Sequence, residues 1–267
     1  MEPTTYETPG PVHLEIRVPS GDVSVQTAAM SQTTLEISGE RSPDEISVVF
    51  EAAGDGHRLV VEQRKRGQFG WTRGRDLKVR VTVPDGSHVQ VAGGSTDLNA
   101  QGTIGSLSFH SGSGDANIEH VVGDAEAKVA SGDLHIETVG GTLSFHSASG
   151  DVTAGVVVGR AMARTASGDV KIATVTSKAK VTTVSGDIAL SSLLAGGSAS
   201  LQAVSGDIVV GVPRGTNVFL DLSSVSGSTS SDLPVSDSPS GEAGGTEESE
   251  ITAATVSGDI SVRHSRD

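Results

Sequence analysis

Hydrophobic and polar residues alternate along most of the chain, and through its middle the alternation repeats every 18 residues. In each repeat an Asp is followed by apolar residues one and three positions later, as Val152 and Ala154 follow Asp151. This period of two predicts a short β-strand with one buried face. A further apolar residue comes six positions after the Asp, and a second alternating pair comes ten and twelve positions after it. We therefore expect two or three short strands in each repeat.

The tripeptide Ser-Gly-Asp separates the strands of successive repeats. Its Asp recurs every 18 residues from position 97, where the tripeptide is Ser-Thr-Asp, to position 187, and the next follows after 20 residues. Such repeats predict the stacked coils of a parallel β-solenoid, about 4.8 Å apart. Gly at the corner would permit a positive φ or a close approach, and Asp would bond nearby backbone N–H groups. The expected structural turn residues are Gly114, Gly132, Gly150, Gly168, Gly186 and Gly206.

The second alternating pair supports direct stacking of the repeats. The sequence Leu-Ser-Phe-His occurs at 107–110 and again at 143–146, whereas the repeats between and after them carry two alanines at the same positions. A layer of large side chains between layers of small ones would interdigitate without voids or clashes. The residue before each tripeptide is small or Val.

The remaining segments complete a predicted domain plan. Residues 1–11 are expected to be disordered, and residues 12–91 contain alternating but non-periodic strands that we expect to cap the solenoid. A cap is needed because an exposed terminal coil is a sheet edge. The regular solenoid spans 92–228, an acidic segment rich in Ser, Gly and Pro at 229–249 predicts a flexible loop, and 250–267 supply a closing coil and tail. The expected fold class is all-β, a parallel β-solenoid with an irregular β-rich N-terminal cap.

Composition and charge exclude several classes of function. The net charge of -14 argues against a nucleic-acid surface and against an anionic membrane surface. With no Cys, the chain has no disulfides and no thiolate chemistry. The N-terminal sequence has neither a basic segment nor an apolar one, and no run approaches 18 apolar residues. We expect a cytoplasmic protein without direct membrane insertion, although a partner could recruit it to an envelope.

The repeated Asp is the first candidate for chemistry. Stacked coils would place these carboxylates about 4.8 Å apart, where like charges repel by about 1 kcal/mol in water. Calcium between them would offset the repulsion. However, calcium-binding β-rolls carry Asp every nine residues, and here Thr142 and Arg160 occupy those positions after Asp133 and Asp151. A turn-forming role is favoured, and the weak metal candidates are Asp115, Asp133, Asp151, Asp169 and Asp187.

The histidines give little support for a metal site. His110 and His146 lie two repeats apart, about 10 Å in a stack with strand spacing, too far to share one metal ion. His120 and His135 belong to adjacent repeats but to different positions within them. We expect no cofactor.

Residues 64–75 are the best candidate for contact with a partner. They hold five of the 19 basic residues and the only Trp of an otherwise acidic chain. Basic residues interleaved with aromatic ones bind phosphate-bearing ligands or acidic partners. The alternative is a hairpin tip with its Trp packed on the cap. The partner-binding candidates are Arg64, Lys65, Arg66, Phe69, Trp71, Arg73 and Arg75.

Three features together resemble a known family. They are a strand that ends in Val-Pro-x-Gly at 83–86, the sequence Ala-Gly-Gly-Ser-Thr-Asp at 92–97, and the repeated Ala/Val-Ser-Gly-Asp units. Over about residues 10–265 the chain resembles the bacterial β-strand-repeat family DUF4097, whose members often carry the name "putative adhesin". The resemblance implies a β-solenoid-like fold and no catalytic residues.

The sequence favours a non-enzymatic protein, because it lacks the motifs of nucleophilic, zinc and nucleotide-binding sites. We expect an adhesin-like or scaffold module that binds an unknown protein partner or itself, and no nucleic acid. One alternative is a carbohydrate-active β-helix enzyme, a lyase or hydrolase, which would need a groove with carboxylates and aromatic side chains. Another is a self-assembling scaffold polymer.

Overall fold

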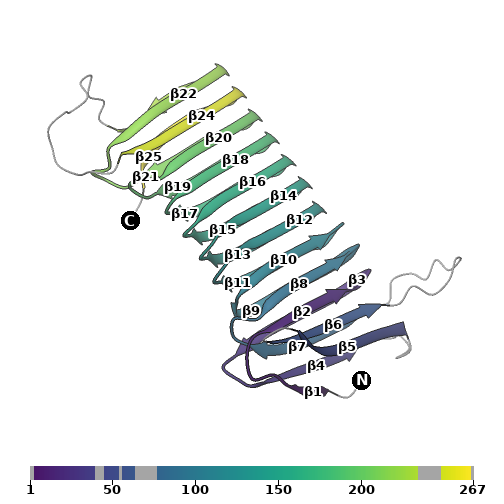
Figure 1. Cartoon of the computed structure of the whole chain (residues 1–267). Coiled ribbons are helices and arrows are strands. Elements are labelled where there is room, and N and C mark those ends of the chain that lie inside the picture. The colour runs from purple at the N-terminus through teal and green to yellow at the C-terminus, as the bar shows by residue number, and fades with distance from the viewer. Residues whose placement is uncertain (1–2, 40–44, 54–55, 64–76, 234–247, 266–267) are drawn as a thin grey trace, which may run out of the picture. The chain divides into compact units, whose positions relative to one another are not determined.

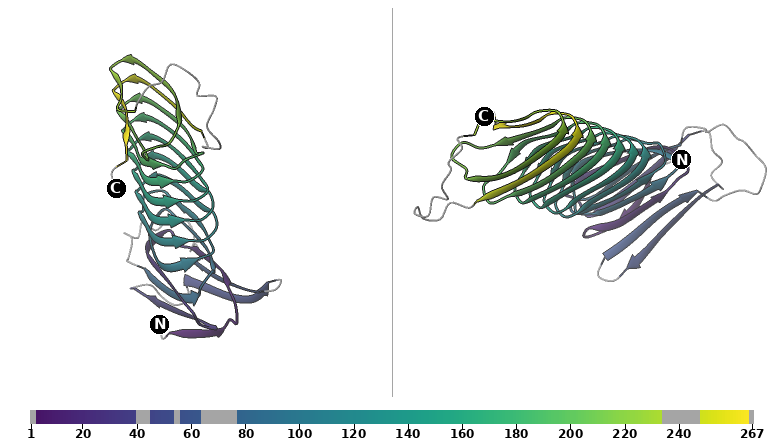
Figure 2. Two further views of the ribbon diagram at one scale, coloured as in Figure 1. Left: turned by 90° about the vertical axis from the view of Figure 1, so that its left-hand side faces the viewer. Right: turned by 90° about the horizontal axis from the view of Figure 1, so that it is seen from above.

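A computed structural model describes residues 3–39, 45–53, 56–63, 77–233 and 248–265, and every regular element in these ranges is a β-strand (Figure 1). The chain divides into two compact units, an N-terminal unit, Met1–Val139, and a C-terminal unit, Gly140–Asp267. In each unit parallel strands stack side by side in two sheets, and each coil contributes one strand to each sheet (Figure 2). Each unit is thus a stack of coils of a parallel β-solenoid, and the predicted all-β class is confirmed.

The described part of the N-terminal unit has thirteen strands. They are β1 (Thr4–Glu7), β2 (Val12–Arg17), β3 (Ser20–Ala28), β4 (Gln32–Ser38), β5 (Ile46–Ala53), β6 (Gly56–Gln63), β7 (Lys78–Pro84), β8 (His88–Gly93), β9 (Ser95–Ile104), β10 (Ser106–Ser111), β11 (Ala116–Val121), β12 (Ala125–Ser131) and β13 (Leu134–Val139). One sheet has the order β1-β4-β7-β3-β9-β11-β13, and the other β12-β10-β8-β2-β6-β5. Its outer strands pair antiparallel, β1 with β4, β4 with β7, and β5 with β6, whereas the inner neighbours are parallel.

In the C-terminal unit, twelve strands lie within the described residues. They are β14 (Leu143–Ser149), β15 (Val152–Val157), β16 (Arg160–Ser167), β17 (Val170–Val175), β18 (Lys178–Ser185), β19 (Ile188–Leu193), β20 (Ser198–Ser205), β21 (Ile208–Val212), β22 (Val218–Ser226), β23 (Thr229–Ser231), β24 (Ser249–Ser257) and β25 (Ile260–His264). One sheet has the order β15-β17-β19-β21-β25-β23, and the other β14-β16-β18-β20-β24-β22. All the neighbouring pairs in this unit are parallel.

The predicted core positions are buried in both units. Phe109 and Phe145 have no exposed surface. Phe109 lies opposite Ala127 in the strand next to it, and Phe145 lies opposite Ala163. Large side chains therefore pack against small ones from one coil to the next, as the sequence predicted.

The structure corrects the predicted boundaries at the N-terminus. Residues 1–11 were expected to be disordered, but Thr4–Glu7 form β1, because β4 supplies antiparallel backbone partners. Residues 12–91 were expected to be an irregular cap, yet β2 and β3 are a regular coil of the stack, and Asp22 lies opposite Asp97. The chain has a further Ser-Gly-Asp at residues 20–22, and the register places its Asp beside the corner Asp97.

The order of the last coils also differs from the prediction. The coil β24–β25, expected to close the solenoid, lies between β20–β21 and β22–β23. The outermost coil of the C-terminal unit is therefore β22–β23, as Figure 1 shows. Within 229–249, expected to be a loop, Thr229–Ser231 form β23 because they pair with β25. Residues 234–247 lie outside the described ranges. In the described ranges, no helix has the length and apolar character needed to cross a membrane.

Candidate functional site

The repeated Asp residues link successive coils. In the N-terminal unit, a carboxylate oxygen of Asp97 accepts the backbone N–H of Asp115 at 2.9 Å, and Asp115 accepts that of Asp133 at 2.9 Å. In the C-terminal unit, Asp151, Asp169, Asp187 and Asp207 accept the N–H of the next corner Asp in the same way, and Asp259 accepts that of Ser228. The backbone N–H that each of these carboxylates accepts therefore belongs to the neighbouring coil.

These bonds lower the pKa values of two of the carboxyls. The pKa of Asp169 lies below its ordinary value, chiefly because the carboxylate accepts the N–H of Asp187, and Lys171 lowers it further against an opposing effect of burial. The pKa of Asp259 is lowered by hydrogen bonds from the backbone and hydroxyl of Ser228. Both carboxylates are thus held in the charged form by the chain's own donors, which is a structural use of the acid.

The corner glycines have no room for a side chain. A Cβ at Gly168 would lie 2.2 Å from the carbonyl oxygen of Gly150, and one at Gly206 would lie 2.1 Å from that of Gly186. Gly206 also has a φ of 147°, which other residues rarely adopt. The hydroxyl of Thr165 donates to the carbonyl of Gly150 as well. The backbones of successive coils are therefore closely packed at the corner, which accounts for the recurrence of Gly at this position of the repeat.

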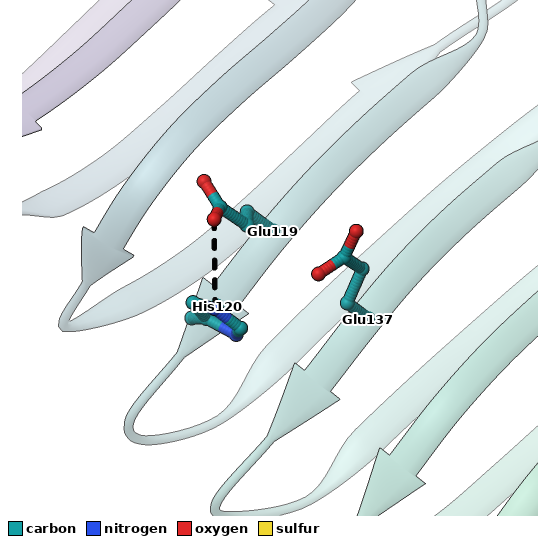
Figure 3. Close-up of side chains that lie close together, drawn as sticks. All are labelled: Glu119, His120 and Glu137. Carbon is teal, nitrogen blue, oxygen red and sulfur yellow. Dashed lines mark ion pairs between the residues drawn. The ribbon is translucent and has the colours of Figure 1, made fainter.

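One group of described residues brings three possible metal ligands within 4.8 Å of one another: Glu119 and His120 of β11 with Glu137 of β13. Figure 3 shows the two side chains of β11 paired with each other and Glu137 extending from the adjacent strand. His120 Nε2 lies 3.6 Å from Glu119 Oε1, and Glu119 Oε2 accepts the backbone N–H of Gly102 at 2.7 Å. Two carboxylates and an imidazole suit a divalent transition metal. Glu119 and His120 are half-buried and Glu137 is exposed, so the group is equally an ordinary surface ion pair with a neighbouring acid.

Comparing histidines alone misses this group, because its other two members are glutamates. Glu119 and His120 both face outward although they are consecutive. The register between β9 and β11 shifts at this point, between Ile118 and His120. This shift concerns β9, where Gly102 has a φ of 87°, whereas β11 and β13 pair in one register. The two consecutive outward residues follow from the repeat itself, because the buried residue after Ile118 is Val121, as Val139 is after Ile136.

Exposed valines form a row beside the corners of the C-terminal unit. Val184, Val204, Val256 and Val225 each precede Ser-Gly, and their exposed fractions are 50, 47, 49 and 79%. They lie in this order on adjacent strands, because the serines that follow them are paired across β18, β20, β24 and β22. We call these four residues the valine ridge. It ends on the outermost coil, where its most exposed member lies.

The outermost coil is incompletely covered. β22 pairs with β24 on one side, and within the described residues its other edge has no partner. Val218, Leu220 and Leu222 face inward but remain partly exposed, and Phe219 faces outward with 56% of its surface exposed. This edge therefore offers both unpaired backbone groups and apolar side chains.

The structure does not describe the basic segment 64–75, so its position relative to these surfaces is not defined. Its partner-binding candidates all lie outside the described residues: Arg64, Lys65, Arg66, Phe69, Trp71, Arg73 and Arg75. Their role stays a prediction. The Asp candidates for calcium are placed at corners, as described above, and the histidines 110 and 146 belong to different units.

Comparison with known proteins agrees with this architecture. The family model described as Toastrack DUF4097 matches residues 12–263. No curated protein matches the chain.

Three solved structures extend over nearly the whole chain at low identity. A "putative adhesin" from Parabacteroides distasonis is 12% identical with a TM-score of 0.47, over 98% of this chain and 97% of that chain. A "putative adhesin" from Bacteroides fragilis is 16% identical with a TM-score of 0.39, over 98% and 97%. A "putative lipid binding protein" from Parabacteroides distasonis is 17% identical with a TM-score of 0.44, over 97% and 96%.

Proposed function

We propose that this chain, which belongs to the Toastrack DUF4097 family, is a non-catalytic interaction module. It binds a second copy of itself through β22. The open edge of β22 is the observation that carries the proposal. An exposed edge strand is a template for pairing with another chain. Proteins blunt such edges with charges, prolines or covering elements, and β22 instead presents Phe219, Leu222 and Val225 with a single charged residue, Asp221.

The sequence of β22 is complementary to itself in one antiparallel register. With Leu222 on a two-fold axis, Phe219 would lie opposite Val225 of the second copy, and Asp221 opposite Ser223. The outward residues of both copies would then share one face, since side chains alternate along a strand. The two carboxylates would not be opposed. Each of the two aromatic–valine pairs would contribute about 0.2–1 kcal/mol, and symmetry makes the contact the same patch on both copies.

The end strands of the sheets favour a closed dimer over a self-assembling scaffold polymer, the alternative named above. In the N-terminal unit the end strands are β1 and β5, which pair antiparallel with β4 and β6 and differ in sequence from β22. A filament needs two different contact surfaces that repeat without closing, whereas a two-fold contact through one edge closes on itself. The valine ridge reaches the same edge and would extend the apolar contact.

The carbohydrate-active alternative would need aromatic side chains along an open groove. In the described part of the chain, Phe109 and Phe145 are buried in the core, and Tyr6 packs on Phe50 with 4.5 Å between ring centroids. Phe219 is exposed, but it lies on an edge strand with three partly exposed aliphatic neighbours. These positions support an interaction surface more than a sugar platform.

The experiment is a measurement of molar mass by size-exclusion chromatography with light scattering over a wide range of protein concentration. We expect a dimer that dissociates on dilution, and a monomer for Leu222→Asp, which would oppose two carboxylates on the axis. Val122→Asp is the matched control, because Val122 is 63% exposed in the other unit. A monomeric wild-type protein at every concentration would contradict the proposal, as would a Leu222→Asp dimer that keeps its native circular dichroism.

A cysteine cross-link gives a second test that does not depend on destabilising the edge. The chain has no Cys, so Leu222→Cys introduces a single thiol. Antiparallel neighbours have Cα atoms about 4.5–5.5 Å apart, within the range that a disulfide spans. We expect a covalent dimer under mild oxidation for Leu222→Cys and none for Val122→Cys.

A further inference from the structure

Four basic residues lie together on the outer face of the C-terminal unit. Arg160 and Arg164 belong to β16, Lys178 and Lys180 belong to the next strand, β18, and all four side chains are exposed. The register places Arg160 directly opposite Lys178, Lys180 opposite Met162, and Arg164 opposite Thr182. We call these four residues the basic face.

Among the residues that the structure describes, no carboxylate forms an ion pair with the basic face. Six basic residues elsewhere in the described chain form ion pairs with carboxylates: Arg17, Arg58, Lys78, Arg80, Lys128 and Lys171. No residue of the basic face forms one within the described ranges. On the neighbouring strand β20 the opposite residues are Ser198, Ser200 and Gln202, and the first carboxylate in that direction, Glu250, lies a further strand away.

Fold stability does not explain this arrangement. Like charges directly opposite across a strand pair are destabilising, and in water two unit charges 4 Å apart repel by about 1 kcal/mol. In a chain with 33 acidic and 19 basic residues, acids are abundant and could have been placed beside these cations. A cluster that lacks such partners is suited to a carboxylate supplied from outside.

We propose that the basic face binds an acidic segment of a partner protein in extended conformation, with its carboxylates at alternate positions. Lys178 and Lys180 are two residues apart on a strand, about 6.6–6.8 Å. An extended peptide repeats its side chains on one side at the same spacing, so a Glu-x-Glu sequence along β18 meets both lysines. Arg160 lies one strand away, about 4.8 Å, close enough for a carboxylate to contact it together with Lys178.

The charge of the rest of the molecule limits the occupant. The chain carries a net charge of -14, and the corner carboxylates of the same unit lie in a row beside the strands. A long polyanion such as a nucleic acid, or a wide anionic lipid surface, would meet these acids as well as the basic face. A short acidic segment contacts the four cations alone. This contact is separate from β22 and goes beyond the proposed self-association.

The test is fluorescence anisotropy of a labelled peptide of alternating Glu and Ser, titrated with the full chain at low salt. We expect binding that weakens as salt is added, because exposed charge pairs are screened. Lys178→Gln/Lys180→Gln should weaken it by about tenfold, the effect of two exposed ion pairs. The matched control is Lys78→Gln/Arg80→Gln, a pair with the same spacing whose members already form ion pairs with Asp22 and Glu36. The affinity of this variant for the peptide should stay within about twofold of the wild-type value.

Further measurements make the outcome decisive. A peptide of the same composition with all Glu residues in one block should bind more weakly if the alternate spacing matters. Absence of binding by the wild-type chain overturns the proposal, and so does an equal loss in the two double variants. Binding of phosphatidylglycerol vesicles without binding of the peptide would assign the face to a lipid surface instead. Molar mass measured on the same samples reports the dimer separately, so failure of one proposal does not imply failure of the other.

Discussion

A carboxylate and a glycine meet at the corners, a hydroxyl joins them at several corners, and each has a separate physical reason. The carboxylate accepts an N–H of the next coil, the glycine admits a carbonyl oxygen at 2.2 Å from where a Cβ would be, and Thr165 or Thr183 donates to that carbonyl. The Asp is therefore explained by coil stacking, and its recurrence needs no catalytic role.

Adding one methyl group at a corner tests this explanation. Gly168→Ala should lower the free energy of unfolding by about 1–3 kcal/mol, the usual cost of forcing extra atoms into a packed site. Gly10→Ala is the control, because nothing lies within 4 Å of a Cβ there. Chemical denaturation followed by circular dichroism measures both. Equal midpoints for the two variants would mean that the corner relaxes freely.

The lowered pKa of Asp169 predicts an acid sensitivity. A carboxyl whose folded-state pKa is depressed stabilises the fold above its unfolded pKa and loses that contribution as the pH falls through the folded value. Stability from Asp169 should therefore be complete above its ordinary pKa of 3.8 and decline below it. In Asp169→Asn the melting temperature should fall less steeply as the pH is lowered through this range, because an amide does not titrate there. The amide oxygen still accepts the N–H of Asp187, so the contact between the coils is kept. Parallel curves for the two proteins would argue against the assignment.

At the scale of the element, alternation of large and small side chains fixes how neighbouring strands pack. Phe145→Ala would leave a cavity, because the residue opposite it in β16 is Ala163 and cannot fill the space. We expect a loss of about 3–5 kcal/mol in unfolding free energy, against less than about 0.5 kcal/mol for Val122→Ala at an exposed position. Urea titration distinguishes the two. A small loss for Phe145→Ala would show that the layers can collapse.

The sequence predicts strands and corners well because each follows from local chemistry. The apolar period of two gives the strands, and Ser-Gly-Asp gives the corners, including those at Asp22 and Asp259. Coil order is different. Every coil presents similar apolar positions to its neighbours, so the pattern permits β24–β25 on either side of β22–β23, and the structure is needed to decide.

The candidate surfaces were only partly predictable for the same kind of reason. The valines before each corner can be read from the sequence, but their exposure depends on where the chain bends. The basic face requires the register of β16 and β18, which brings Arg160 beside Lys178. The Glu119 group requires the register of β11 and β13, which brings Glu119 and His120 beside Glu137.

At the scale of the whole molecule, the last coil in the sequence supports the coil before it. β22 has β24 as its described neighbour, so a chain that ends after Glu248 should lose β22 as well as β24. Hydrogen exchange should then show loss of amide protection in 218–226. A chain that ends after Ser265 should keep it. Protection of 218–226 in the shorter chain would mean that β22 can pair with β20 directly.

The place of β24–β25 also bears on how the protein is made. A ribosome releases 218–231 well before 249–264, yet the earlier segment has no strand to dock on until the later one emerges. The stack can form coil by coil as far as β21, but the next coil to be added is β24–β25, and among the described strands β22–β23 pair only with that coil. Residues 249–264 therefore complete two coils at once, and their release, rather than that of 218–231, sets the moment at which these coils acquire their structure.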